Sequence, residues 1–301
     1  MSKPRSAPRR RVDGVLLLDK PTGMTSNAAL QSARRLFNAE KAGHTGTLDP
    51  MATGLLPLCF GEATKFASEL LDADKTYRAT VRLGVTTDTA DAEGRVLETR
   101  PVAVSEHQWR VAMADFVGEI EQVPPMYSAL KRDGKPLYEY ARQGIELERA
   151  PRRVTIHELR LLSRQGDCFD LEVACSKGTY VRTLVADIGA ALGCGAHLAA
   201  LRRTRIGRLD VADAMGLAAL EALSLPERDS RLLPADALLG DAGRADLTEA
   251  ETSRILHGQG VRWIGQPGDR CRLHGSDGRF LGLGEVSSDG WLNPRRLIAT
   301  H

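Results

Sequence analysis

Hydrophobic and polar residues along the chain follow two different periods, one typical of strands and one of helices. Residues 15–18, Val-Leu-Leu-Leu, form a continuous apolar run between turn residues, which predicts a strand buried on both faces. Further strands are predicted at residues 77–85, 154–162, 169–175 and 196–204. Apolar positions that repeat every three or four residues predict helices at residues 25–37, 62–71, 105–116 and 180–192. A fold with both strands and helices is therefore expected.

The pattern changes near residue 238. Residues 217–233 are expected to be helical, interrupted at Pro226 and stopped by the next proline, because proline disrupts a helix interior. One helix is predicted at residues 247–256. Short strands are predicted at residues 261–264, 270–274 and 280–286, with Asp277-Gly278 as a hairpin turn. The chain is thus expected to end in a small β-rich unit.

A polar loop interrupts the pattern within residues 41–58. Its glycines and Pro50 disfavour a regular helix or a central strand, because glycine loosens the backbone and proline removes a hydrogen-bond donor. The apolar run at residues 55–60 would anchor the loop on a buried element, and loops on rigid scaffolds often carry catalytic groups. Asp49 is the acidic residue of this loop. An aspartate before a proline is also a common turn former, so these residues alone leave a purely structural turn open.

Composition and charge are those of an ordinary globular protein. The chain has 301 residues, 42% of them hydrophobic and 27% charged, which suits one large domain with or without a small appendage. Its net charge of +2 does not by itself indicate a nucleic-acid partner. Of the 41 basic residues, eight are lysines and the other 33 arginines, which suit bidentate phosphate contacts. An arginine-rich genome would produce the same bias.

Several classes of protein are not supported by the sequence. The five cysteines are scattered and include no CxxC pair, which indicates neither a disulfide framework nor a zinc site. No apolar run reaches the length of a membrane span, and the N-terminus lacks the apolar core of a secretory signal. We therefore expect a reducing, cytoplasmic compartment, without a membrane or a metal site.

Two segments are rich in basic side chains. Residues 1–11 carry five of them and no hydrophobic periodicity, so we expect a disordered basic tail with at most a weak, salt-sensitive attraction to phosphates. Residues 124–153 interleave lysines and arginines with tyrosines. This combination suits looped RNA, because phosphates attract cations and unstacked bases stack on flat rings. A solvated charged insertion is the alternative.

Five blocks of the chain resemble one known family. The block GHTGTLDPMATGLLPLCFGEATK begins at Gly43 and contains Asp49. The other blocks are VDGVLLLDKPTGMTS from Val12, KTYRATVRLGVTTDTADAEG from Lys75, PPMYSALKRDGKPLYEYAR from Pro124 and SKGTYVRTLVADIG from Ser176. Together they cover most of residues 12–206, in the family's order, and closely resemble the bacterial tRNA pseudouridine-55 synthases, the TruB-type family.

The resemblance implies a fold and a division into domains. The fold would be α/β (α+β), the pseudouridine synthase fold, with a mixed, largely antiparallel sheet flanked by helices. Residues 12–237 would form the catalytic domain, in which residues 124–153 are an insertion that clamps RNA. Residues 238–301 resemble, more weakly, a PUA-like RNA-binding β-barrel, and a stabilising appendage is the alternative.

The resemblance also assigns roles to site residues. Asp49 would be the catalytic nucleophile, and Tyr77 would pack its ring against the target uracil. Arg182 lies in the first turn of a predicted helix, where the helix dipole favours anions. A partner carboxylate would offset that cost, and the resemblance names Asp49. The other substrate-binding positions would be His44, Tyr180, Leu201 and Lys20. Asp91 matches a family position whose role stays open.

Some of these side chains also have plain structural readings. Tyr77 lies on the apolar face of its predicted strand, so a core tyrosine fits the pattern as well. Leu201 likewise fits a hydrophobic core. Lys20 follows a predicted strand directly, where a solvated turn lysine is common.

The chemistry of the family reaction needs few components. Converting uridine to pseudouridine breaks the bond from ribose C1′ to uracil N1 and rejoins the base through C5 without a change in oxidation state, so no cofactor is expected. A carboxylate with an ordinary pKa of about 3.9 is ionised at pH 7. Arg182 would hold Asp49 in position and keep it charged. Attack at C1′, attack at uracil C6 and loss of the C2′ proton all stay open as routes.

The expected partner is the T stem-loop of tRNA, bound by a monomer that needs no protein partner. The target base has to leave its stack to react, and His44 would fill or brace the vacated space. The alternatives are a non-catalytic tRNA-binding chaperone and a guide-RNA-dependent synthase of the related dyskerin branch. The set of Asp49, Tyr77 and Arg182 argues against the first, and the long insertion against the second.

Overall fold

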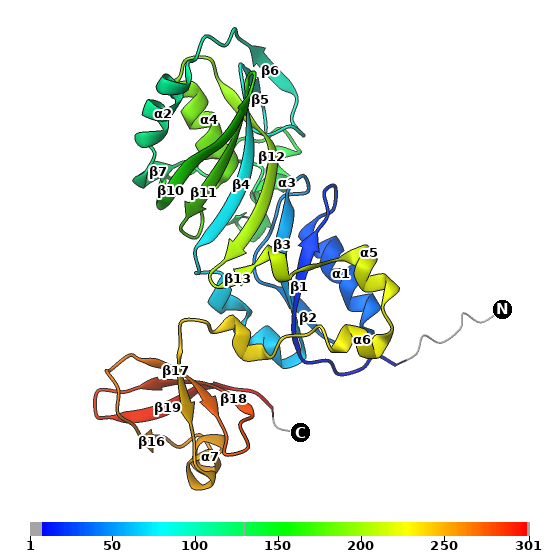
Figure 1. Ribbon diagram of the computed structural model, residues 1–301, viewed down its shortest axis with the longest axis vertical. Helices are drawn as coiled ribbons and strands as arrows, with labels where there is room; N and C mark the ends of the chain where they lie inside the picture. Colours follow the sequence, from blue (N-terminus) through cyan, green and yellow to red (C-terminus); the bar gives the residue numbers. More distant parts are fainter. Residues whose placement is uncertain (1–7, 129, 300–301) are drawn as a thin grey trace, which may run out of the picture.

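Two β-sheets and a series of short helices make up the computed structural model, which describes residues 8–128 and 130–299 (Figure 1). The larger sheet runs in the order β14-β1-β3-β12-β4-β11-β10-β7, with β2 and β13 paired to β3 and β12. Its strands are β1 (Gly14–Lys20), β2 (Ala42–His44), β3 (Thr53–Phe60), β4 (Lys75–Leu83), β7 (Gly118–Gln122), β10 (Arg152–Gln165), β11 (Cys168–Cys175), β12 (Ala196–Ile206), β13 (Leu209–Asp210) and β14 (Met215–Gly216).

The smaller sheet runs in the order β15-β17-β18-β19-β16. Its strands are β15 (Gly243–Asp246), β16 (Val261–Arg262), β17 (Arg270–His274), β18 (Phe280–Val286) and β19 (Trp291–Leu297). Two separate hairpins pair β5 (Val85–Thr87) with β6 (Val96–Thr99) and β8 (Lys131–Arg132) with β9 (Lys135–Pro136).

The helices are short. The α-helices are α1 (Ser26–Leu36), α2 (Glu106–Ala114), α3 (Leu137–Ala141), α4 (Val181–Ala191), α5 (Leu217–Ala222), α6 (Leu225–Asp229) and α7 (Glu249–Leu256). The 3₁₀ helices are η1 (Gly61–Leu70), η2 (Val211–Asp213) and η3 (Ala235–Leu238). In the part of the chain that the structure describes, no helix is both long and apolar enough to cross a membrane.

The large sheet is mixed and largely antiparallel, as expected. Parallel pairing joins β1 to β14 and β12 to β3, and the pairs along the rest of the sheet are antiparallel. Gly54 permits the close approach of β3 to β12. Its φ is +98°, and a Cβ there would lie 2.3 Å from the Arg203 carbonyl oxygen. The start of β3, directly after the polar loop, is therefore fixed against β12.

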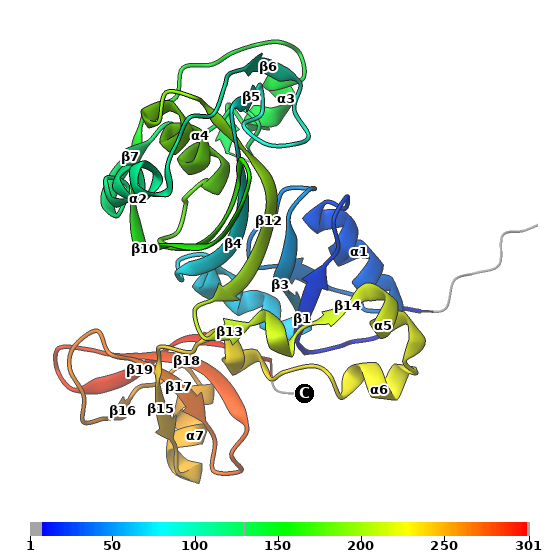
Figure 2. The ribbon, with the colours of Figure 1, turned by 45° about the horizontal axis from the view of Figure 1, so that its top comes forward.

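Two hydrophobic cores lie on opposite faces of the first strands. In β1, Leu16 and Leu18 belong to one core and Val15 and Leu17 to the other, which explains why its apolar run is continuous. The first core extends along the sheet, whose strands β12, β4 and β10 curve around α4 with α2 beside it (Figure 2). Helices α4 and α2 therefore cover the face of the sheet that carries this first core.

The second core joins the two sheets. It contains Leu17 and Leu55 on the back of β1 and β3, Phe66 of η1, and Phe280 and Leu283 of β18. The rings of Phe66 and Phe280 meet edge to face, with their centroids 5.5 Å apart. The smaller sheet therefore packs, through η1, on the back of β1 and β3. Strand β3 directly follows the polar loop.

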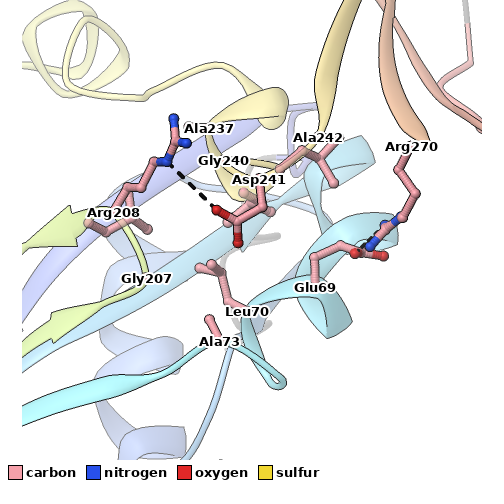
Figure 3. Close-up of a pocket in the computed structure, with 13 residues that line it drawn as sticks. Glu69, Leu70, Ala73, Gly207, Arg208, Ala237, Gly240, Asp241, Ala242 and Arg270 are labelled. Carbon is pink, nitrogen blue, oxygen red and sulfur yellow. Dashed lines mark hydrogen bonds and ion pairs between the residues drawn. The ribbon is translucent and has the colours of Figure 1, made fainter. Parts of the chain in front are cut away.

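A cavity of about 130 Å³ lies at this junction (Figure 3). It opens between the end of η1, the turn that joins β12 to β13, and the segment after η3. Two ion pairs border it: Arg208 Nε lies 3.7 Å from Asp241 Oδ1, and Arg270 pairs with Glu69. We assign this cavity to the packing of the two sheets.

Most of the strands and helices predicted for residues 12–206 are confirmed, with one exception. Residues 61–70 form a 3₁₀ helix where an α-helix was expected. The buried Ala63 and Phe66 are three residues apart, a spacing that suits three residues per turn. Several short strands, β7 and β14 among them, were not predicted; β14 has two residues, and β7 alternates partly exposed with exposed side chains up to the buried Gln122.

The prediction of one interrupted helix at residues 217–233 is wrong in its detail. The chain forms two helices, α5 and α6, with the break at Leu223 and Ser224. Ser224 makes a capping box with Glu227 at the start of α6. Pro226 therefore lies in the first turn of α6, where a proline costs no helical hydrogen bond.

The smaller sheet is curled and open. The described residues show five strands, of which three were predicted, and its edges β15 and β16 do not pair with each other there. Residues 1–7 of the expected basic tail lie outside the described residues. Arg10 does not fit the expected disorder, because its Nη1 donates to Asp229 Oδ2 over 2.7 Å and its Nε donates to the Phe37 carbonyl.

Candidate active site

The polar loop between β2 and β3 presents Asp49 at the mouth of a cavity. Its backbone is held from beneath: the Leu48 N–H donates to Ser26 Oγ at 2.8 Å, and Ser26 Oγ donates back to the Leu48 carbonyl. The Thr45 N–H donates to the Pro57 carbonyl in β3. These bonds tie the loop to α1 and β3, so the direction of Asp49 is set by buried elements.

Lys20 also supports this loop, and it does so differently from what we expected. Its side chain is fully buried, and Nζ donates to the carbonyls of Pro21, Met24 and Pro50 at 2.9, 2.6 and 3.2 Å. Burial lowers the pKa of Lys20 to about 8. Because three carbonyls accept from its Nζ, Lys20 braces the loop.

Arg182 joins three parts of the site. Its Nη2 lies 3.4 Å from Asp49 Oδ2, and its Nη1 lies 3.5 Å from Asp91 Oδ2. Nη2 also donates to the carbonyl of Tyr127, at the start of the 124–153 insertion. The Arg182 side chain is 4% exposed and that of Asp49 35%, so the arginine is a buried anchor and the carboxylate is open to the cavity.

Burial and charge act in opposite directions on Asp49. Loss of solvation raises the pKa of the Asp49 carboxyl, and the nearby Asp91 charge raises it further. Arg182 and Lys20 lower it but do not cancel the effect of burial. Arg182 thus favours the charged form of Asp49, as expected, but burial outweighs it and the pKa of Asp49 stays above its ordinary value.

Asp91, whose role the sequence left open, is a second carboxylate on Arg182. It is buried, and its Oδ1 accepts hydrogen bonds from Thr89 Oγ1 at 2.6 Å and from the Glu93 N–H at 3.1 Å. Both donors come from the loop after β5, which fixes the carboxylate. Asp91 therefore pairs with Nη1 of Arg182, whereas Asp49 pairs with Nη2.

An inner cavity of about 150 Å³ brings five predicted site residues together. They are Asp49 of the loop, Tyr77 of β4, Leu201 of β12, and Tyr180 and Arg182 at the start of α4. The Tyr180 backbone is fixed by Gln122, whose side-chain amide accepts from its N–H at 3.1 Å and donates to its carbonyl at 3.3 Å. Two tyrosines and a leucine around a carboxylate form a pocket suited to one flat ring.

An outer cavity of about 700 Å³ opens beside the inner one and shares Asp49, Ser128 and Arg182 with it. His44 and the N-terminal end of α1 line one side. The insertion also contributes to the lining, with Lys131 of β8, Tyr138 of α3 and Arg142 among its residues. Cations and an aromatic ring thus share with the polar loop a space large enough for part of a nucleic-acid loop.

His44 lies on β2 and is partly buried. Burial lowers its pKa, and so does the nearby Arg203 charge, which leaves the imidazole neutral at pH 7. Its Nδ1 accepts from the Gly46 N–H at 3.4 Å, which orients the ring. A neutral, oriented ring at the cavity edge suits stacking more than a contact with phosphate.

Two residues of the site had no signal in the sequence, and a third, Asp91, matched a family position without a role. The role of Asp91 can be recognised only where Arg182 lies beside it, and that of Gln122 only through its contact with Tyr180. Ser128 lines both cavities, and its buried Oγ has no hydrogen-bond partner among the described residues. No group of three His, Cys, Asp or Glu side chains in residues 8–128 and 130–299 is arranged to hold a metal ion.

Comparisons with known proteins identify the family. Residues 34–181 match the model of the TruB family pseudouridylate synthase N-terminal domain. Residues 182–240 match the tRNA pseudouridylate synthase B C-terminal domain, and residues 244–298 match the pseudouridine synthase II TruB C-terminal model.

Two curated relatives and one solved structure extend this result. The tRNA pseudouridine synthase B of Aromatoleum aromaticum is 61% identical over 292 residues, with 97% of this chain and 94% of the relative covered. That of an Azoarcus species is 62% identical over 296 residues, with 98% of each chain covered. A chain of an H/ACA RNP bound to a substrate RNA containing 2′-deoxyuridine shares the fold, with a TM-score of 0.73 at 23% identity, over 95% of this chain and 85% of that one. The family resemblance of the five sequence blocks is thus confirmed, and the chain belongs to the TruB family of pseudouridylate synthases.

Proposed function

We propose that this protein is an isomerase that converts uridine to pseudouridine in tRNA, with the T loop and its uridine at position 55 as the target. The relatives that span nearly the whole chain are tRNA pseudouridine synthases, which supports the reaction and the class of RNA. One observation supports the proposed site: Asp49 and Arg182 form an ion pair in a cavity that Tyr77, Tyr180 and Leu201 also line.

The inner cavity sets the geometry of the proposed reaction. A uracil flipped out of the RNA would lie between the rings of Tyr77 and Tyr180, with its sugar beside Asp49. The bond from C1′ to N1 breaks, the base turns, and the bond from C1′ to C5 forms. The proton on C5 leaves, and N1 gains one, so no electrons are exchanged.

Asp49 is the proposed nucleophile because it is the carboxylate that faces the cavity. Arg182 holds one of its oxygens and leaves the side chain 35% exposed. A carboxylate with a raised pKa is a stronger nucleophile once it is ionised. The same carboxylate lies beside the sugar whether it attacks C1′, attacks C6 of the uracil or assists loss of the C2′ proton.

The outer cavity supports a role for the insertion and for His44. His44, the start of α1, Tyr138 and Arg142 line the same cavity, so the T loop would contact all of them when it enters there. His44 would occupy the space that the flipped base leaves. The Arg182 contact with the Tyr127 carbonyl joins this clamp to the nucleophile.

The smaller sheet is proposed as a PUA-like RNA-binding unit. It is a curled, five-stranded sheet matched by a family C-terminal model. Its packing on η1 would give it a constant position relative to Asp49. We propose that the protein acts as a monomer on tRNA without a protein partner, in the cytoplasm where its substrate is made.

The decisive experiment uses an unmodified T-arm RNA labelled at the target uridine. Wild type is expected to form pseudouridine with no metal or cofactor added, and Asp49→Asn is expected to bind the RNA but form none. Glu106→Gln is the matched control, because Glu106 pairs with Arg110 on the exposed surface of α2. Conversion by Asp49→Asn would remove Asp49 from its role, and binding without conversion by wild type would favour the chaperone or a guide-dependent enzyme.

A further inference from the structure

Arg152 belongs to the 124–153 insertion but contacts the inner cavity. It is the first residue of β10, which pairs with the edge strand β7 (Figure 1). Lys131 and Arg142 of the insertion line the outer cavity, whereas the guanidinium of Arg152 lies over the ring of Tyr180, with Cζ 4.8 Å from the ring centroid. Its Nη2 donates to the Gly178 carbonyl. A basic residue of the expected RNA clamp therefore contacts a tyrosine that lines the inner cavity.

The register of β10 against β7 places Arg152 beside Gln122. The two residues are direct partners in the antiparallel pair, so their side chains lie on the same face of the sheet. Gln122 bonds to the N–H and the carbonyl of Tyr180, and Arg152 covers the ring of the same tyrosine. Neighbouring positions of two strands thus hold the backbone and the ring of Tyr180.

The turn before α4 leaves room for the guanidinium. Gly178 has a φ of +81°, a backbone conformation that favours glycine, and a Cβ built there would lie 3.4 Å from Arg152 Cζ. No side chain of the turn residue therefore separates the guanidinium from the backbone. Arg152 contacts both this turn and the ring that follows it in the chain.

Arg153, the next residue, shows how a surface arginine of this strand behaves. Its Nη1 pairs with Glu119 Oε1 at 3.1 Å, and 72% of its side chain is exposed. No carboxylate of the described residues forms an ion pair with Arg152, and its buried Nε has no hydrogen-bond partner among them. The face of the Tyr180 ring, which carries partial negative charge, therefore takes the place of an anion.

The Tyr180 ring also contacts Arg182, whose Cζ lies 5.7 Å from the same centroid. Arg182 in turn pairs with Asp49. Arg152, Tyr180, Arg182 and Asp49 thus form a continuous row of contacts from the insertion to the proposed nucleophile. Because Arg182 also donates to the Tyr127 carbonyl, both ends of the insertion meet the start of α4.

We propose that Arg152 is a positioning residue that holds the ring of Tyr180 in the plane on which the flipped uracil stacks, and that it is not a phosphate contact of the insertion. This inference rests on the proposed function, whose site it makes more specific. The plane of the ring sets the angle at which the nucleotide meets Asp49, and errors in orientation lower the rate of the chemical step. Affinity for the RNA comes largely from phosphate contacts, so it depends less on this ring.

The test compares wild type and Arg152→Gln on the labelled, unmodified T-arm RNA. The single-turnover rate at saturating enzyme is expected to fall about 10-fold, while Kd changes by less than about 2-fold. The slope of log Kd against log salt concentration should stay that of wild type, because loss of a phosphate contact would reduce it by about 0.7–0.9. Arg160→Gln is the matched control, since Arg160 lies in the same strand and pairs with Glu172, and it should leave the rate unchanged. A reduced salt slope in Arg152→Gln would overturn the proposal.

Two changes at Tyr180 test whether the ring is the partner of Arg152. Tyr180→Phe keeps the ring, so Arg152→Gln should slow this variant by the same factor as wild type. Tyr180→Leu removes the ring, so Arg152→Gln should have little further effect on it. Equal slowing in the Tyr180→Leu background would mean that Arg152 acts on something other than the ring, which contradicts the proposal.

Thermal unfolding shows whether each variant is folded. If Arg152→Gln does not fold, Arg152→Lys keeps the charge but not the flat guanidinium, and it is compared in the same three backgrounds with the same expected order. No pseudouridine from wild type would instead refute the proposed function.

Discussion

The surroundings of Asp49 oppose the ionisation of its carboxyl group. The pKa of Asp49 is raised by burial, and a raised pKa in the folded state means that the protonated form stabilises the fold and the ionised form does not. This stabilisation is fully present below the unfolded pKa of about 3.9 and is lost as the pH rises through the higher folded pKa. At pH 7 the native protein therefore folds with a penalty at Asp49.

Removing this penalty should stabilise the protein at pH 7. Asp49→Asn removes the charge that burial opposes, so it should unfold at a higher temperature than wild type at pH 7. The difference should shrink as the pH falls below 4, where wild-type Asp49 is itself protonated. Thermal unfolding of both proteins at several pH values checks this. A lower unfolding temperature for Asp49→Asn at pH 7 would mean that the pair with Arg182 outweighs burial.

The second prediction concerns Asp91. Its charge raises the pKa of Asp49, so Asp91→Asn should move the acid limb of the rate profile to lower pH. The same change leaves Arg182 with one carboxylate, and we expect the rate at pH 7 to fall about 10-fold or more with little loss of RNA affinity. The rate is measured from pH 4.5 to 8, and Glu106→Gln on the exposed surface of α2 serves as control. An acid limb that stays in place would separate Asp91 from Asp49.

At the scale of the elements, the parallel contact of β3 with β12 fixes the end of the polar loop that carries Asp49. Gly54 has a positive φ and no room for a side chain against Arg203. Gly54→Ala is therefore predicted to destabilise the fold by about 2–4 kcal/mol and to reduce activity, because both strain and a clash act there. Gly144→Ala is the matched control: it too has a positive φ, but no atom lies within 4 Å of its Cβ position among the described residues. Denaturant unfolding should show a smaller loss for Gly144→Ala, about 1–2 kcal/mol.

Elements with a strong local pattern were predicted from the sequence, and weakly patterned ones were not. β4 and β11 alternate apolar and polar side chains along most of their length, and α4 repeats its apolar positions at helical spacing. β14 has two residues, and it is a strand because β1 offers it a parallel edge. Such a strand is decided by its neighbour, so no local pattern could indicate it.

For the whole molecule, the shared core behind β1 and β3 couples the two sheets. Phe280→Ala removes a ring from that core and is predicted to cost about 3–5 kcal/mol. Because the core is shared, both sheets should still unfold in one transition, at lower denaturant. Ile264→Ala, at a fully exposed position in the loop after β16, should change stability by no more than about 0.5 kcal/mol. Two separate transitions in wild type would show that the sheets are independent.

The sequence by itself determined the family and the type of most long elements, because motif spacing and periodicity are local properties of the chain. It also placed Asp49, Tyr77, Tyr180, Arg182 and Leu201 among the site residues, and these five line one cavity. The roles of those side chains remain proposals that the variants above test.

Only the tertiary structure decided which charges are buried and what they hold. Arg202 and Arg203 are neighbours in β12, and the sequence does not tell them apart. In the fold, Arg202 pairs with Asp19 near the surface, whereas Arg203 lies under Tyr77. The difference comes from the register of β12 against β4, which is set by contacts distant in sequence and interrupted by irregularities at two points. A shift of one residue would exchange the two side chains between the faces of the sheet. The register of the folded sheet therefore decides which of the two charges is buried beside the site.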